Sequence, residues 1–173
     1  GGRLSGAKGG ILILETMREI IRRAPSAKLL VVGKKDGYAV RMAEKAAALG
    51  IGNSVVFTGW LDMSMIKKAY GASTVVAIPS VCFDSFPNGN LEAFAAGKPV
   101  VATCFGGSRE IVHEGENGHI VNPFNVPVLA DALADFITDK KKAQQFGEAG
   151  RRLVVESYTV EEAAKKYLAL FSE

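Results

Sequence analysis

Two carboxylates, Asp84 and Glu92, stand at either end of a short segment whose residues could do chemistry. The segment follows an apolar, strand-like run at 74–78 and leads into an alanine-rich helix over 91–96. A loop that leaves the carboxyl end of a buried strand and opens a helix is where open α/β sheets bind ligands. Two carboxylates in such a loop suggest a general acid and a general base. The sequence therefore predicts a ligand site at 84–92.

Basic residues and helix starts indicate that the ligand carries negative charge. Arg3 and Lys8 flank a glycine-containing turn ahead of a helix, and Gly89 would let a ligand approach the backbone closely. A helix terminus contributes about 0.3–1 kcal/mol to anion binding. A cation about 4 Å from a phosphate charge contributes about 4 kcal/mol at an effective dielectric constant of 20, before desolvation is subtracted. We therefore expect Arg3 and Lys8 to dominate the binding of charge.

Familiar nucleotide and metal signatures do not fit. Residues 33–37 lack the G-x-G-x-x-G spacing of a dinucleotide site, and Lys98 is followed by proline instead of the Ser or Thr of a P-loop. His113 and His119 are expected to be surface or packing residues. No cysteine or histidine shows metal-ligand spacing, so we expect no metal site and free thiols at the two cysteines.

Composition and charge describe an ordinary globular domain. The chain has 173 residues, of which 48% are hydrophobic and 23% charged, with a net charge of +3. This length suits one full core, so we expect a single domain over 1–173. Because acidic and basic residues alternate, we expect no nucleic-acid partner. No apolar run or signal pattern predicts a membrane span or secretion, which favours a cytoplasmic protein.

Short apolar runs alternate with stretches of helical periodicity, as in βαβ units around a parallel sheet. The expected strands are 29–32, 55–57, 75–78, 100–102 and 119–121, and the expected helices are about 9–24, 38–49, 62–71, 89–96, 107–114, 126–138, 140–156 and 159–172. Right-handed crossovers make a doubly wound, Rossmann-like parallel sheet the natural α/β assembly. Because the chain starts at Gly1, we expect a piece of a longer protein, with a further strand just upstream of Arg3.

Several motifs occur together in a characteristic order, at 2–4, 8–9, 30–33, 56–59, 79–80, 84–103, 106–112 and 115–118. Together they resemble the C-terminal domain of retaining glycosyltransferases with the B-type fold, most closely the large group called family four. The resemblance covers nearly the whole chain. Two features depart from the family pattern. Asp84 stands where the family usually has Glu, and the sequence from Phe86 to Asn90 replaces Phe-Gly followed by apolar residues.

The resemblance implies that this domain holds a nucleotide-sugar donor. By position, Arg3 and Lys8 would hold the diphosphate and stabilise the leaving group, Glu92 would bind the ribose hydroxyls, and Asp84 would face the donor sugar. Backbone N–H groups of the donor-binding loop would contact sugar hydroxyls and phosphate; the loop comprises Phe86, Pro87, Asn88, Gly89, Asn90 and Leu91, of which Pro87 has no N–H to donate. The base pocket would be lined by Gly33, Asp36, Trp60 and Leu61. The carboxylates are then a clamp for the donor, not an acid–base pair.

The resemblance also implies partners and an activity. The reaction would move a hexose from a UDP-, GDP- or ADP-sugar to a hydroxyl acceptor, a glycan or a lipid-linked molecule, with retention. It would need no cofactor and no essential metal. The acceptor would bind an N-terminal domain of the same full-length protein, and any membrane association would come through that domain or a lipid acceptor. We expect this chain alone to bind donor but transfer little.

Two alternatives stay open. The chain could be a catalytically impaired nucleotide-sugar-binding module, in which Asp84 marks the loss of activity. It could also belong to a sugar-nucleotide epimerase or a phosphorylase of the same fold.

Overall fold

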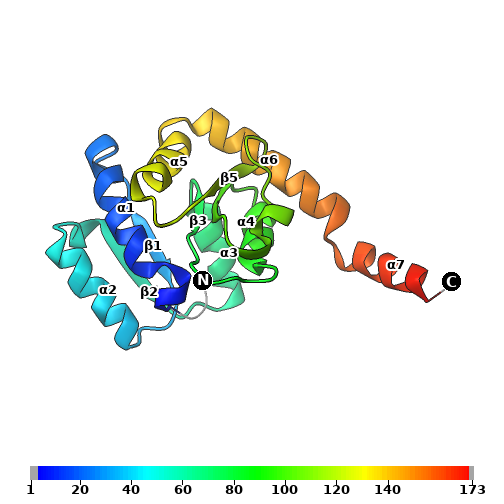
Figure 1. Ribbon diagram of the computed structural model, residues 1–173, viewed down its shortest axis with the longest axis horizontal. Coiled ribbons are helices and arrows are strands. Elements are labelled where there is room, and N and C mark those ends of the chain that lie inside the picture. Colours follow the sequence, from blue (N-terminus) through cyan, green and yellow to red (C-terminus); the bar gives the residue numbers. More distant parts are fainter. Residues whose placement is uncertain (1–3, 172–173) are drawn as a thin grey trace.

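A computed structural model describes residues 4–171 and shows parallel strands alternating with helices (Figure 1). The strands are β1 (Leu29–Val32), β2 (Val55–Gly59), β3 (Val76–Ile78), β4 (Val100–Thr103) and β5 (Gly118–Val121). The helices are α1 (Gly10–Arg23), α2 (Gly37–Ala48), α3 (Met63–Ala72), α4 (Asn88–Ala95), α5 (Val126–Thr138), α6 (Lys140–Ser157) and α7 (Val160–Leu170), with 3₁₀ turns η1 (Gly6–Lys8), η2 (Gly52–Ser54) and η3 (Gly106–Glu110). The predicted α/β class is confirmed.

The strands form two parallel ladders, β1 with β2 and β3-β4-β5, where the sequence predicted one sheet. A doubly wound sheet has the strand order 3-2-1-4-5-6. In that numbering, β1 and β2 would be strands 2 and 3, and β3, β4 and β5 would be strands 4, 5 and 6. The expected strand upstream of Arg3 would be strand 1, between β1 and β3. That strand lies outside the described residues.

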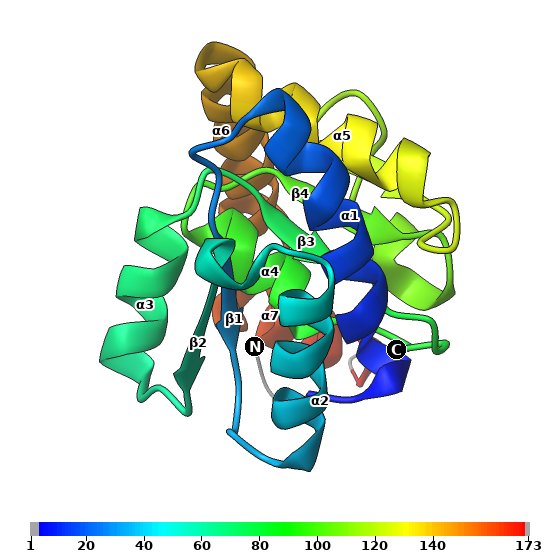
Figure 2. The same cartoon turned by 90° about the vertical axis from the view of Figure 1, so that its left-hand side faces the viewer.

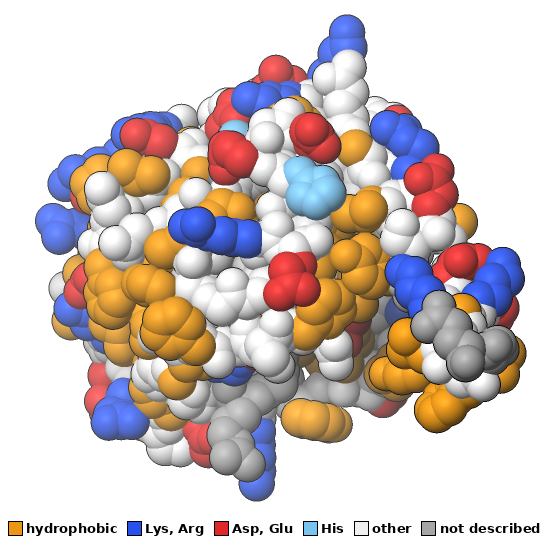
Figure 3. Space-filling view, turned by 45° about the vertical axis from the view of Figure 1, so that its right-hand side comes forward, with side chains coloured by type: hydrophobic (Ala, Val, Ile, Leu, Met, Phe, Trp, Pro, Cys, Tyr) orange, Lys and Arg blue, Asp and Glu red, His pale blue; other side chains and the backbone are white. Residues whose placement is uncertain are grey.

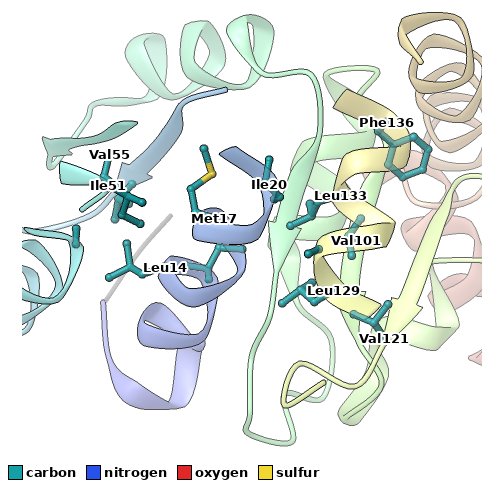
Figure 4. Close-up of a cluster of buried hydrophobic side chains, with 14 of the residues drawn as sticks. Leu14, Met17, Ile20, Ile51, Val55, Val101, Val121, Leu129, Leu133 and Phe136 are labelled. Atoms are coloured by element: carbon teal, nitrogen blue, oxygen red, sulfur yellow. The ribbon is translucent and has the colours of Figure 1, made fainter. Parts of the chain in front are cut away.

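Helices cover both faces of the strands. Helices α1, α2 and α5 bury the first core cluster, and α3, α4 and α6 contact the second. Figure 2 shows α1 and α5 side by side, and Figure 4 shows Leu14 and Leu129 among the buried side chains of the first cluster. Strand β4 is buried throughout, with Val101 in the first cluster and Val100 in the second. Burial on both faces explains the apolar run at 100–102.

Side-chain caps confirm two predicted helix starts. The Asp62 carboxylate accepts from the Met65 N–H (2.9 Å), and the Thr159 hydroxyl accepts from the Glu162 N–H (3.2 Å). The predicted helix over 107–114 is wrong, because only η3 forms there. The Asn117 side chain accepts from the His113 N–H (2.8 Å) and donates to the Ile111 carbonyl (3.1 Å), which closes a turn where a helix would continue.

Helix α7 extends away from the rest of the chain (Figure 1). Leu153 and Val154 of α6 contact the second core cluster. In α7, by contrast, Tyr167 and Leu170 are exposed. Figure 3 shows hydrophobic side chains on this part of the surface. Within residues 4–171, no helix combines the length and apolar character that crossing a membrane requires.

Candidate functional site

Turn η1 lies against the loop that follows β3. The Val81 N–H donates to the Ala7 carbonyl at 2.8 Å. Gly9 has φ of 71°, and a Cβ there would stand 2.0 Å from the Pro79 carbonyl oxygen. Only glycine fits such a backbone angle and such a close approach without strain. This contact places the start of α1, and Lys8 with it, beside the loop that carries Asp84.

Lys8 and Asp84 form an ion pair although they are 76 positions apart in the chain. The Lys8 Nζ donates to Asp84 Oδ2 at 2.8 Å, with side-chain exposures of 45% and 29%. The hydrogen bond from Lys8 holds the pKa of the Asp84 carboxyl below its usual value of 3.8. Since an ammonium has three donors, Lys8 can bind a further anion while it keeps this bond. Arg3, the other predicted cation, lies outside the described residues.

We expect Lys8→Met to raise the pKa of the Asp84 carboxyl back toward 3.8, because it removes the main cause of the lowered value. A pKa lowered by folding stabilises the protein above the unfolded-state value, and the stabilisation is lost as pH falls through the folded-state value. Both side chains reach solvent, so this contribution should stay below about 1 kcal/mol. Carbon-detected NMR titration of the carboxyl in both proteins measures the change; an unchanged pKa would contradict the assignment.

Turn η3 supports the Asp84 loop from the other side. The Gly107 N–H donates to the Asp84 carbonyl at 2.9 Å. A Cβ at Gly107 would stand 1.8 Å from the Ser85 carbonyl oxygen, so the two backbones are in direct contact. The turn after β4 therefore holds the loop after β3, and the Asp84 carboxylate is carried by a fixed backbone.

The loop before α4 and the start of the helix turn several side chains inward, whereas Asn88 is exposed. Asn90 is buried and donates from Nδ2 to the Ser108 hydroxyl at 3.2 Å. The Phe86 ring lies 5.7 Å from the Tyr158 ring, and Pro87 is buried and has no N–H. These side chains serve the core, so the backbone N–H groups at the start of α4 are what this segment can offer an anion.

Glu92 is exposed on the second turn of α4 and has a fixed partner. The Tyr70 hydroxyl, from α3, donates to Glu92 Oε2 at 2.8 Å. Burial, and then the bond to Glu92, raise the pKa of Tyr70, so Tyr70 stays protonated and acts as the donor. Asp84 and Glu92 thus bond to different partners, which fits two separate binding roles better than an acid–base couple.

The four residues expected around the base follow β1 and β2. The Gly33 N–H donates to the Gly59 carbonyl at 3.2 Å and extends the ladder. Trp60 is 73% exposed and Leu61 is half-buried. Asp36 has a structural role: its Oδ1 accepts hydrogen bonds from the Tyr38 and Ala39 N–H groups and caps α2. An Asp just before a helical pattern is a start signal, so the sequence could have revealed this cap.

We expect Asp36→Ala to lower the free energy of unfolding by about 1 kcal/mol, the usual cost of losing an N-cap. Asp36→Ser keeps a capping oxygen and should stay close to the wild type. Urea unfolding of the three proteins measures the difference. Equal stability of the alanine and serine variants would contradict the capping role.

Sequence reasoning missed Tyr70 and three phenylalanines near the strand ends. Phe83, Phe105 and Phe124 follow β3, β4 and β5, with ring centroids 5.8 Å apart for the first pair and 6.2 Å for the second. Phe83 is 84% exposed and Phe124 62%. Each follows an expected strand closely, which is the signal that could have grouped them. Exposed aromatic clusters of this kind are typical of surfaces that contact other molecules.

Among the described residues, neither a metal cluster nor the hollow beside α5 offers a second candidate site. Within the part of the chain that the structure describes, no three His, Cys, Asp or Glu side chains are placed to hold a metal ion. Cys82 and Cys104 are free and half-buried, as expected. A hollow of about 610 Å³ lies between α1, α5 and β5. Its charged groups bond to one another, Arg23 to Asp131 and His119 to Glu114 and Asp135, so we assign it no ligand.

The sequence and the fold of this chain are similar to those of known proteins. Residues 1–153 match the family described as "Glycosyl transferases group 1". The chain is 31% identical over 96% of its length to the lipopolysaccharide 1,2-N-acetylglucosaminetransferase of Salmonella typhimurium, and covers 45% of that protein.

Solved structures agree with the sequence match. The Anabaena protein Alr3699/HepE in complex with UDP superposes with a TM-score of 0.90 at 25% identity, over 99% of this chain and 48% of that one. The C-terminal domain of a glycosyl transferase group 1 protein (LpcC) from Francisella tularensis superposes with a TM-score of 0.83 at 27% identity, over 92% of this chain and 84% of that one. The chain therefore spans less than half of the Salmonella and Anabaena proteins.

Proposed function

The chain belongs to the glycosyl transferases group 1 family, and on that premise we propose that it is the donor-binding part of a retaining hexosyltransferase. The full-length protein moves a hexose from a nucleotide-diphosphate sugar to a hydroxyl acceptor, a glycan or a lipid-linked molecule. The observation that carries the proposal is the Lys8–Asp84 pair, held by η1 and η3 at the same edge as the start of α4. A UDP complex of a similar structure supports it.

Cationic side chains bind the diphosphate in this proposal. Lys8 keeps Asp84 as one partner and directs its remaining N–H donors to phosphate oxygens. Arg3, by its position in the sequence, adds a second cation. Negative charge develops on the diphosphate as the sugar leaves, and fixed cations at that point stabilise the transition state more than the ground state. We propose that these cations replace a metal ion, and that no cofactor takes part.

The two carboxylates hold the two ends of the donor. Glu92 accepts hydrogen bonds from the ribose hydroxyls, since an ionised carboxylate accepts two such bonds well. Asp84 faces the donor sugar, and its bond to Lys8 links the sugar contact to the diphosphate contact. Backbone N–H groups at the start of α4 add contacts to the donor. The base lies toward the ends of β1 and β2, near Gly33, Trp60 and Leu61.

The acceptor and the rest of the cleft belong to the full-length protein. We propose that an N-terminal domain binds the acceptor and that this chain alone binds donor but transfers little. The reaction then takes place in the cytoplasm, and a lipid acceptor or the N-terminal domain would account for any membrane association.

A thermal-shift screen with UDP, GDP, ADP and their sugars tests the proposal. A ligand at 100 times its dissociation constant adds about 2.7 kcal/mol of stability, equivalent to roughly 5–11 °C for a chain of this size. One base should give a clear shift and the matching nucleoside a much smaller one, because the diphosphate contacts would be missing. No shift with any nucleotide diphosphate would contradict the donor-binding role.

An impaired binding module is the second candidate, favoured by the short Asp84 side chain and its bond to Lys8. In the full-length protein, Asp84→Asn should abolish transfer if Asp84 takes part in the reaction, and Asp84→Glu should retain it. An impaired module would show no transfer in any of the three proteins. Product analysis separates both cases from an epimerase or a phosphorylase.

A further inference from the structure

We infer that Tyr70 is a positioning residue for the donor: its hydroxyl orients the Glu92 carboxylate toward the ribose of the nucleotide. The inference rests on the proposed role of Glu92. It adds a residue on α3 to a site otherwise built from η1, the β3–α4 loop and α4.

The contact joins a partly buried group to an exposed one. Tyr70 packs against the second core cluster, whereas Glu92 is exposed on α4. The bond from the Tyr70 hydroxyl to Glu92 Oε2 is 2.8 Å long. An exposed glutamate loses considerable rotamer freedom when a ligand orders it. Tyr70 restricts that freedom beforehand, so that less ordering is needed when the ribose binds.

The bond leaves the carboxylate able to bind a diol. An ionised carboxylate has about four lone-pair sites on its two oxygens. Tyr70 occupies one site on Oε2, which leaves Oε1 and the other site of Oε2 for two neighbouring hydroxyl donors. Burial of Tyr70 keeps its proton in place, so the hydroxyl donates to Glu92 and does not compete for the same ribose hydrogens.

The end of α3 is held in place on both sides of this contact. The Ser73 hydroxyl donates to the Tyr70 carbonyl at 2.8 Å. Lys98, which follows α4, donates from Nζ to the Gly71 carbonyl at 2.8 Å. Helix α3 is therefore bonded to α4 through Tyr70–Glu92 and to the segment after α4 through Lys98. This double connection keeps the Tyr70 hydroxyl at a fixed place relative to α4.

Calorimetric titration with UDP, GDP and ADP, each against its 2′-deoxy form, tests the inference. The wild-type chain should prefer the ribose form of the base that it binds. Tyr70→Phe should reduce that preference by about three- to tenfold, the effect of one hydrogen bond, and weaken binding of the 2′-deoxy form less, because that form keeps only one hydroxyl for Glu92. Tyr158→Phe is the matched control, because its hydroxyl in the same cluster donates to the Glu110 carbonyl (3.3 Å) and not to Glu92.

Each outcome separates the inference from the proposed function. If Tyr70→Phe keeps the wild-type preference for ribose, Tyr70 does not position Glu92 and the inference is overturned. If the wild-type chain binds both forms equally, the ribose role of Glu92 is wrong and the inference falls with it. Lys98→Met keeps Tyr70 but removes the bond from Lys98 to the Gly71 carbonyl at the end of α3. This second variant tests the inference if Tyr70→Phe does not fold. It should lower the preference partially, and an unchanged preference would count against the inference.

Discussion

Replacing Lys8 by methionine is expected to weaken nucleoside diphosphate binding by about 10- to 100-fold. The estimate follows from the roughly 1.5–3 kcal/mol that a hydrogen bond to a charged group contributes. Lys8 supplies the charge nearest to Asp84 in the described chain and is held there by η1. The loss should be smaller at high salt, because screening already weakens this contact in the wild type. Calorimetric titration at two salt concentrations measures both effects.

Lys45→Met is the matched control for Lys8→Met. Lys45 also pairs with a carboxylate, that of Glu15 at 3.0 Å, and its side chain is 37% exposed. This pair joins α2 to α1 and lies outside the proposed site. Both variants lose one positive charge, so a general electrostatic effect would appear in both. If Lys8→Met binds within twofold of the control, Lys8 does not contact the diphosphate.

Gly107→Ala should unfold the protein about 6–12 °C below the wild type. A Cβ at Gly107 would stand 1.8 Å from the Ser85 carbonyl oxygen and 2.8 Å from its carbonyl carbon. Because both atoms are backbone, the loop must move as a whole, and about 3 kcal/mol is a reasonable cost for such overpacking. The same movement would shift Asp84, whose carbonyl accepts from Gly107. Donor binding should therefore weaken as well.

Gly37→Ala is the control for this substitution. Gly37 is the first residue of α2, and no heavy atom lies within 4 Å of a Cβ built there. Its free energy of unfolding should stay within about 0.5 kcal/mol of the wild type. Thermal unfolding of both variants measures the contrast, and equal melting temperatures would contradict the tight loop contact.

The sequence predicted most of the elements and named both Lys8 and Asp84 as site residues, although it did not predict the bond between them. Residues 100–102 form the apolar run that predicted this strand, because β4 is buried on both faces. Lys8 and Asp84 were each expected at the ligand-binding edge, one from a glycine turn before a helix and one from a loop after a strand. Parallel strands bring such segments to one edge of the sheet, so their meeting follows from the fold class.

Other features depend on distances that a sequence does not contain. The Tyr70–Glu92 bond requires a particular spacing between α3 and α4, which the packing of their apolar faces determines. The exposure of α7 does not follow from its sequence, because an amphipathic pattern shows which residues share a face and does not show what covers that face. The roles of Arg3 stay predictions, since Arg3 lies outside the described residues.

The location of the donor site is best decided by amide NMR of the isotope-labelled chain, titrated with the nucleoside diphosphate that gives the largest thermal shift. We predict that resonances of Lys8, of 84–92 and of the residues after β1 and β2 move, while those of α7 do not. Shifts gathered instead around Arg23, His119 and Asp135, in the hollow between α1, α5 and β5, would contradict the proposed site.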